Sequence, residues 1–72
     1  MQMSFRLLDT VALTKDVPEH GLSQGQVGTV VDAYYPGVYE VEFSDQHSRP
    51  YANVSLYAEQ LMLLFYEPVL VF

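Results

Sequence analysis

The chain has 72 residues, no cysteine, and nine Asp and Glu residues against three Lys and Arg, for a formal net charge of −6. This length allows one small domain, and the absence of cysteine excludes disulfides and thiolate metal sites as its stabilisers. The three cations, Arg6, Lys15 and Arg49, are too scattered for a phosphate-binding stripe, so we do not expect a nucleic acid partner. The acidic balance favours a basic protein partner instead.

The first half of the chain predicts two strands around a long loop. Residues 9–14 alternate with a period of two, which is typical of a strand. A loop follows over residues 15–26, where Pro18 bars a central strand and Leu22 is expected to anchor the loop to the core. A glycine-punctuated segment then leads into a second strand over residues 27–34, which is rich in β-branched side chains.

The second half predicts three more strands. Pro36 and Gly37 favour a tight turn, and residues 38–43 form the third strand, with Tyr39, Val41 and Phe43 on its inner face. After a polar loop, residues 51–56 form a fourth strand, with Ala52, Val54 and Leu56 inward. Residues 57–60 predict one helical or 3₁₀ turn, and residues 61–65 a fifth strand.

This order predicts an all-β fold, a small five-stranded SH3-like barrel with a one-turn 3₁₀ helix before the last strand. We assign residues 1–66 to the barrel and residues 67–72 to a carboxyl-terminal tail, because Pro68 does not suit a central strand. No signal peptide or apolar segment long enough to cross a membrane is visible, so we expect a cytoplasmic protein with no membrane partner.

The chemistry-bearing residues do not form a catalytic or metal-binding motif. There is no nucleophile elbow and no phosphate-binding loop, and the closeness of Asp45, His47 and Ser48 in sequence does not supply the geometry of a triad. Asp16, Glu19 and His20 lie in one loop but match no metal-ligand spacing. We therefore predict no catalytic residue, no metal, no cofactor and no enzymatic activity.

The tyrosines are better candidates for binding. Tyr35, Tyr51 and Tyr57 fall in or beside predicted loops and could line a groove for an extended peptide. Three carboxylates would form its acidic rim: Asp16, Glu19 and Asp45. The alternative for each tyrosine is structural packing, since half-buried sheets favour this residue.

The carboxyl-terminal strand is apolar on both of its faces. Leu61, Leu63 and Phe65 cannot share the core side with the residues between them, which leaves one face exposed. Exposed contiguous apolar surface marks an interface, so we predict a homodimer contact through Met62, Leu64 and Tyr66. The alternative is that residues 69–72 fold back over this face.

The chain also resembles a family of small bacterial domains of unknown function, common in cyanobacteria, over residues 7–64. The resemblance rests on LDTVALT (8–14), PEHGL (18–22), GQVGTVV (25–31), YEVEF (39–43), YA (51–52) and AEQL (58–61). It implies an SH3-like barrel without known activity. Some members are encoded beside toxin-like or uncharacterised proteins, which implies an antitoxin, immunity or accessory role. Arg49-Pro50 departs from the Gly-Arg or Gly-Lys turn of the family.

Residues 25–31 are also similar to the loop-strand motif of ribosomal and transcription-factor barrels that bind RNA. Those barrels are basic, whereas this chain lacks the Lys and Arg residues that contact phosphates. The main hypothesis is thus a non-enzymatic protein-interaction module that binds a basic partner, and an RNA-binding barrel is the alternative.

Overall fold

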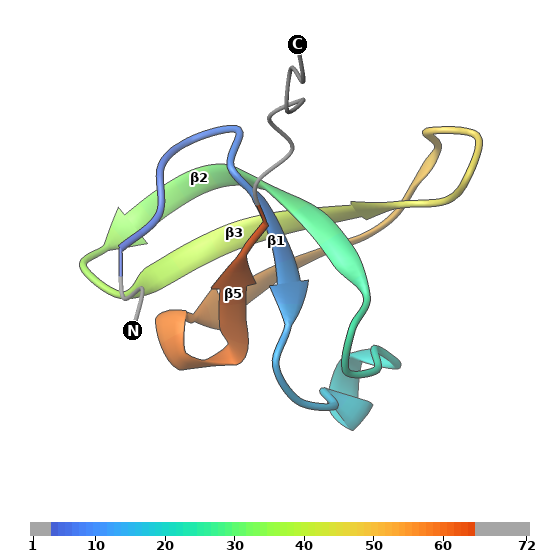
Figure 1. Cartoon of the computed structure of the whole chain (residues 1–72), viewed down its shortest axis with the longest axis horizontal. Helices are drawn as coiled ribbons and strands as arrows, with labels where there is room; N and C mark the ends of the chain where they lie inside the picture. Colours follow the sequence, from blue (N-terminus) through green and yellow to red (C-terminus); the bar gives the residue numbers. More distant parts are fainter. Residues whose placement is uncertain (1–3, 65–72) are drawn as a thin grey trace, which may run out of the picture.

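The computed structural model describes residues 4–64, which form one antiparallel sheet and two short 3₁₀ helices (Figure 1). The predicted all-β fold, with five strands and a 3₁₀ turn before the last one, is confirmed. The elements are β1 (Thr10–Leu13), η1 (Pro18–His20), β2 (Val27–Tyr35), β3 (Val38–Ser44), β4 (Pro50–Tyr57), η2 (Ala58–Gln60) and β5 (Leu61–Leu63).

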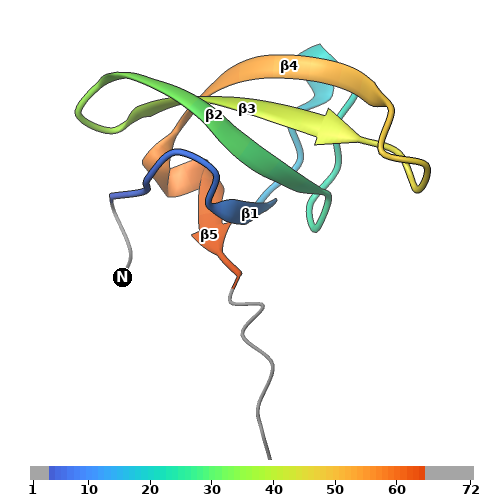
Figure 2. The ribbon, with the colours of Figure 1, turned by 90° about the horizontal axis from the view of Figure 1, so that it is seen from above.

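The strands lie in the order β4-β3-β2-β1-β5, so β4 and β5 are the two end strands of the sheet. β1 pairs with both β2 and β5, and every pairing is antiparallel. Figures 1 and 2 show the sheet curling over, with β1 and β5 running steeply across β2 and β3. This barrel-like curvature lets one small sheet enclose a core on its inner side.

The core lies inside this curved sheet and is built from alternating strand positions. The predicted inner faces are confirmed, because Tyr39, Val41 and Phe43 of β3 and Val54 and Leu56 of β4 are all buried. The largest fully buried side chains are Phe43, Leu13, Val11, Val30 and Val41. Alternation is what places these residues together, since successive side chains of a strand point to opposite faces.

The loop between β1 and β2 is anchored to the core from within. The predicted anchor Leu22 is buried, and Val17 is buried beside it. The backbone groups of these two residues exchange hydrogen bonds of 2.9 and 3.1 Å, which close the segment around η1. Burial of two apolar side chains compensates part of the entropy lost in ordering such a loop.

The β2–β3 hairpin turns at Pro36 and Gly37, as predicted, and Gly37 has the positive φ of 84° that glycine tolerates best. β2 contains two register shifts against β3, one between Val30 and Asp32 and one between Ala33 and Tyr35. Each shift puts an extra residue into β2, which bends the strand and increases its twist. Tyr34 is the extra residue of the second shift.

The last strand is shorter than predicted. We expected a strand over residues 61–65, whereas β5 is Leu61–Leu63. The next residue, Leu64, still donates its backbone N–H to the Thr10 carbonyl. The predicted tail at residues 67–72 lies outside the described residues. Within residues 4–64, no helix has the length and apolar character needed to span a membrane.

Candidate functional site

A hollow of about 360 Å³ lies on the sheet where β2, β3 and β4 meet near the β2–β3 turn. We call it the outer pocket, and it is lined by Tyr35, Val38, Ser55, Leu56 and Tyr57. Val38 is the register partner of both Tyr35 and Tyr57. Residues directly opposite one another in antiparallel strands share a face, so the two tyrosines flank Val38 on the same side of the sheet.

The aromatic side chains of the outer pocket are held at its rim and remain largely in solvent. Tyr35 is 70% exposed and Tyr57 is 61% exposed. The Tyr57 backbone N–H donates to the Gln60 side chain at 2.8 Å, and the Ala58 N–H donates to the Gly37 carbonyl at 2.9 Å. These bonds fix the end of β4 against the β2–β3 turn, so the pocket is built on rigid elements.

A row of carboxylates runs across the sheet beside the outer pocket. Asp32, Glu40 and Ser55 are register neighbours on β2, β3 and β4, and the Ser55 hydroxyl donates a hydrogen bond of 2.7 Å to Glu40 Oε1. Glu42 is the next residue on this face of β3. We call Asp32, Glu40 and Glu42 the acidic row. Among residues 4–64, none of these three carboxylates has a salt bridge to a cation.

The pKa of the exposed residue Tyr34 reports the negative charge of this face. Coulombic repulsion from the Glu40 carboxylate raises the pKa of Tyr34 above its ordinary value of 10.0. Desolvation and the charge of Asp32 add smaller contributions in the same direction. The hydroxyl of Tyr34 therefore lies in the negative field of the acidic row, where a positively charged ligand group would be attracted.

The structure brings together two of the three tyrosines predicted to form a groove. Tyr51 lies at the other end of β4, six residues before Tyr57 and thus about 20 Å along the strand. Its hydroxyl accepts a hydrogen bond of 2.8 Å from Gln26 Nε2, and its ring lies 6.5 Å from that of Phe43. Tyr51 does not line the outer pocket.

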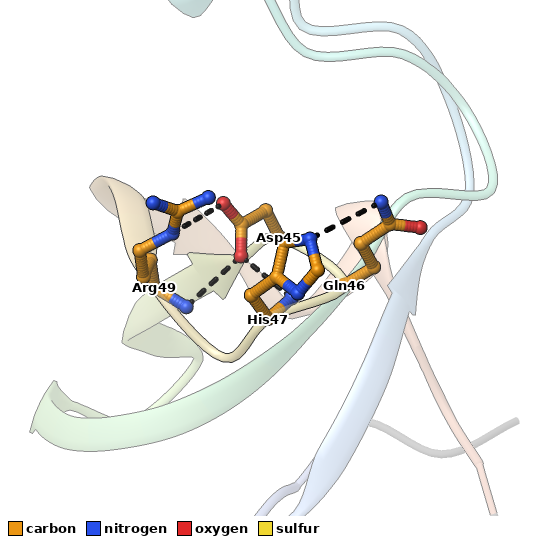
Figure 3. Close-up of polar contacts among 4 residues, drawn as sticks. All are labelled: Asp45, Gln46, His47 and Arg49. Carbon is orange, nitrogen blue, oxygen red and sulfur yellow. Dashed lines mark hydrogen bonds and ion pairs between the residues drawn. The ribbon is translucent and has the colours of Figure 1, made fainter.

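Asp45, predicted as part of the acidic rim, organises the β3–β4 loop (Figure 3). Its Oδ1 accepts the backbone N–H groups of His47 at 2.8 Å and Arg49 at 3.0 Å, and its Oδ2 lies 3.3 Å from Arg49 Nε. The His47 ring faces the Gln46 amide instead of the Asp45 carboxylate (Figure 3). The Asp45 carboxylate therefore stabilises the turn of its own loop. It does not orient the His47 ring, as the acid of a catalytic triad would.

The other predicted rim residues, Asp16 and Glu19, belong to the β1–β2 loop. Asp16 Oδ1 accepts the Gln24 backbone N–H at 2.8 Å, and Glu19 lies exposed in η1. In the part of the chain that the structure describes, no group of three His, Cys, Asp or Glu side chains is arranged to hold a metal ion. The acidic residues beside the outer pocket are therefore those of the acidic row.

The predicted dimer contact is described in part. Met62 is half exposed on β5, Leu64 is half-buried, and Tyr66 lies outside the described residues. Leu61 is buried and Leu63 packs against the core, as one face of this strand was expected to do.

Sequence reasoning missed Tyr34, Val38 and the acidic row as neighbours of Tyr35 and Tyr57. The alternation of Glu40 and Glu42 with core residues did indicate that both carboxylates face outward. Nothing in the sequence located the two register shifts of β2, which decide where Asp32 and Tyr34 lie relative to β3.

Comparison with known proteins gives one family. A family model described as "Domain of unknown function (DUF4926)" matches residues 7–63, most of the chain. The comparisons with curated proteins and with solved structures give no match. The expected membership in a family of domains of unknown function is thus confirmed.

Proposed function

Since the chain belongs to the DUF4926 family of domains of unknown function, we propose that it is a non-enzymatic protein-interaction module. It binds a basic segment of a partner protein on the face that carries the outer pocket and the acidic row. In this role the chain acts as an accessory or antitoxin-like subunit that stabilises or neutralises a basic protein.

The observation that carries the proposal is the position of Glu40 beside the outer pocket. Ser55 lines the pocket, and its hydroxyl also donates a hydrogen bond to Glu40 Oε1. One site therefore offers exposed tyrosine rings, the apolar side chain of Val38, and an oriented carboxylate. Aromatic faces attract Lys and Arg cations, and tyrosine is enriched among the residues that dominate protein interfaces.

The charge of the whole chain supports the same partner. The net charge is −6, and Arg49 already pairs with Asp45 in its own loop. The acidic row carries unneutralised charges on adjacent strands, whose mutual repulsion a cationic segment would relieve. Such a field also steers a basic partner toward this face before contact.

The test is binding of a short synthetic peptide in which every second residue is Lys or Arg, with one Leu at the end of this series and Thr at the positions between, monitored by the amide chemical shifts of the full chain. We expect shifts in residues 34–38 and 55–57 and an affinity that falls about tenfold in Tyr57→Ala, as for an interface hot spot. Tyr51→Ala is the matched control, because it removes an exposed tyrosine from the other end of β4.

Two further probes complete this test. The same peptide with Glu in place of Lys and Arg should not bind, since the acidic row repels it. A single-stranded RNA oligonucleotide represents the alternative function. Salt-sensitive binding of that oligonucleotide, with no binding of the basic peptide, would overturn the proposal in favour of an RNA-binding barrel.

A further inference from the structure

The strand that carries Ser55 and Tyr57 is also an open edge. β4 stands at one end of the strand order and pairs with β3 alone. In Figure 2 it forms the margin of the sheet, with β3 on its inner side. Among residues 4–64, the opposite side of β4 has no strand neighbour.

The pairing of the sheet identifies which residues of β4 face this edge. In an antiparallel sheet, successive residues of a strand direct their backbone groups alternately to one neighbour and to the other. The backbone groups of Val30 point to the β1 side: its N–H donates to the Asp9 carbonyl, and its carbonyl accepts the Leu8 N–H. Thr29 therefore faces β3, and its register partner Glu42 directs its backbone groups to β2.

The alternation then continues across β3. Because Glu42 faces β2, Val41 and Phe43 direct their backbone groups to β4, where they meet Val54 and Ala52. The residues between these positions, Asn53 and Ser55, accordingly present their N–H and carbonyl groups at the open edge. The bond from the Tyr57 N–H to Gln60 Oε1, instead of to β3, agrees with this alternation.

Over residues 52–57, this edge lacks the usual protection against strand pairing. Natural edge strands carry a charged residue, an interior proline or a bulge, or they are very short. β4 has eight residues and no charged side chain, and its one proline, Pro50, is its first residue. Its register shift against β3 makes Tyr51 an extra residue beside that proline, at the same end of the strand. The edge is therefore able to accept another strand over residues 52–57.

The carboxylates beside the edge favour a basic strand as the segment that pairs with β4. Glu40 and Glu42 of the acidic row lie one strand inward, on β3, so a strand added to β4 would run about 10 Å from them. Lys and Arg side chains on the outer face of such a strand would extend over Ser55 and Asn53 toward these carboxylates. A second copy of this chain would instead bring a further net charge of −6 to the same edge.

We propose that a basic, extended segment of the partner adds to the open edge of β4 as a sixth strand of the sheet. On the outer face of the added strand, Lys and Arg side chains lie opposite the acidic row, and one apolar side chain of the same face, at the Tyr57 end, enters the outer pocket between Tyr35 and Tyr57. This inference rests on the proposed function and deepens it, since it assigns the backbone conformation and alternating pattern of the bound segment.

The decisive variant is Asn53→Pro, tested with the basic peptide. Proline removes the Asn53 N–H, which faces the edge and takes no part in the β3–β4 ladder, so the free protein should remain folded. We expect the affinity to fall about tenfold or more, because strand addition draws its affinity from main-chain hydrogen bonds. Asn53→Ala is the matched reference, because it removes the same side chain and keeps the N–H, so the further loss of affinity in Asn53→Pro measures the main-chain contribution.

Two N-methylated peptides provide a second measurement that does not depend on the folding of a variant. One carries N-methyl groups at its odd positions and the other at its even positions. In a strand added to β4, the N–H groups of only one set face the edge. We therefore expect one peptide to lose binding and the other to keep it.

The outcomes separate this inference from the proposed function. No binding of the basic peptide at all would overturn both. Binding that depends on Tyr57 but is equal for both N-methylated peptides would overturn strand addition and leave the proposed function standing. A dimer of the chain that Asn53→Pro dissociates would assign the edge to a second copy and overturn the inference.

Discussion

The hydroxyl of Ser55 on β4 donates a hydrogen bond of 2.7 Å to Oε1 of Glu40 on β3, and the two residues are direct register partners. Hydrogen bonds to an ionised carboxylate are among the stronger ones in proteins. This bond holds the carboxylate beside the outer pocket in one orientation. It thereby links the apolar part of the candidate site to its charge.

Replacement of Ser55 by Ala should weaken peptide binding with little change in folding. Ser55 is exposed, so we expect the free energy of unfolding to change by less than about 0.5 kcal/mol. The affinity for the basic peptide should fall about threefold to tenfold, because the Glu40 carboxylate loses its fixed orientation. Titration of the peptide against both proteins measures this difference. An unchanged affinity would show that Glu40 needs no positioning by Ser55.

The field of the acidic row should appear in the titration of Tyr34. Glu40→Gln removes the main repulsion, so we expect the pKa of Tyr34 to fall toward 10.0. The raised pKa contributes stability that is present below the unfolded value and is lost as the pH rises through the folded value. Ring ¹³C shifts of Tyr34 against pH measure the effect. Glu19→Gln, a change in η1, is the control that should leave this titration unmoved.

The core depends on one hydrogen bond that the strand pattern does not reveal. The backbone N–H of buried Phe5 donates to the hydroxyl of buried Tyr39 at 3.1 Å, and their rings meet edge to face at 5.2 Å. Tyr39→Phe leaves this N–H without its partner, so we expect a loss of about 1–3 kcal/mol in the free energy of unfolding. Urea denaturation measures it. Tyr51→Phe, which removes an exposed hydroxyl bond, should cost less than about 0.5 kcal/mol.

Alternation and turn chemistry made most of the fold predictable. The inward sets of β3 and β4 follow from a period of two, and the β2–β3 turn follows from Pro36 and Gly37. Burial of Phe5 and Val17 did not follow, because Phe5 precedes a turn and Val17 lies inside the loop after β1, and neither belongs to a segment with a period of two. Tertiary contacts decided their burial.

The candidate site was predictable at two tyrosines that fall beside predicted loops. Tyr35 lies at the β2–β3 turn and Tyr57 at the end of β4, and both line the outer pocket. Asp45 and Asp16 were chosen for their charge, but their carboxylates accept backbone N–H groups of their own loops. Loop carboxylates that satisfy local backbone donors are difficult to distinguish from binding residues by composition. Only the hydrogen bonds seen in the structure distinguish a carboxylate that stabilises its own loop from one that is free to bind a partner.

Gly28 is needed for the close approach of β2 to β3. A Cβ at this position would lie 2.7 Å from Val41 Cγ1 and 2.9 Å from the Glu42 carbonyl oxygen. We expect Gly28→Ala to cost about 1–3 kcal/mol in the free energy of unfolding, the usual effect of overpacking. In a Val41→Ala background the same change should cost less, by at least about 0.5 kcal/mol, because the nearest methyl group is gone. Additive losses in this double-mutant cycle would contradict the packing explanation.

The outer face of the sheet also carries a short apolar row, at the end formed by β1 and β5. Ala12 on β1 is the register partner of both Met62 on β5 and Val27 on β2, so the three side chains share a face. Met62 is 50% exposed and Val27 is 42% exposed. The row is separate from the outer pocket and from the open edge of β4, and it includes Met62 of the predicted dimer contact.

If this apolar row forms the homodimer contact, light scattering of the full chain should give twice the mass of one chain. Met62→Lys places a charge within the contact, where burial without a partner is costly, so we expect the mass to fall to that of one chain. Glu59→Gln changes the net charge by the same single unit and lies exposed in η2, so it should leave the dimer intact. A single-chain mass for the unmodified protein would mean that Met62 and Val27 are not a self-association surface. A dimer that survives Met62→Lys would place the contact elsewhere.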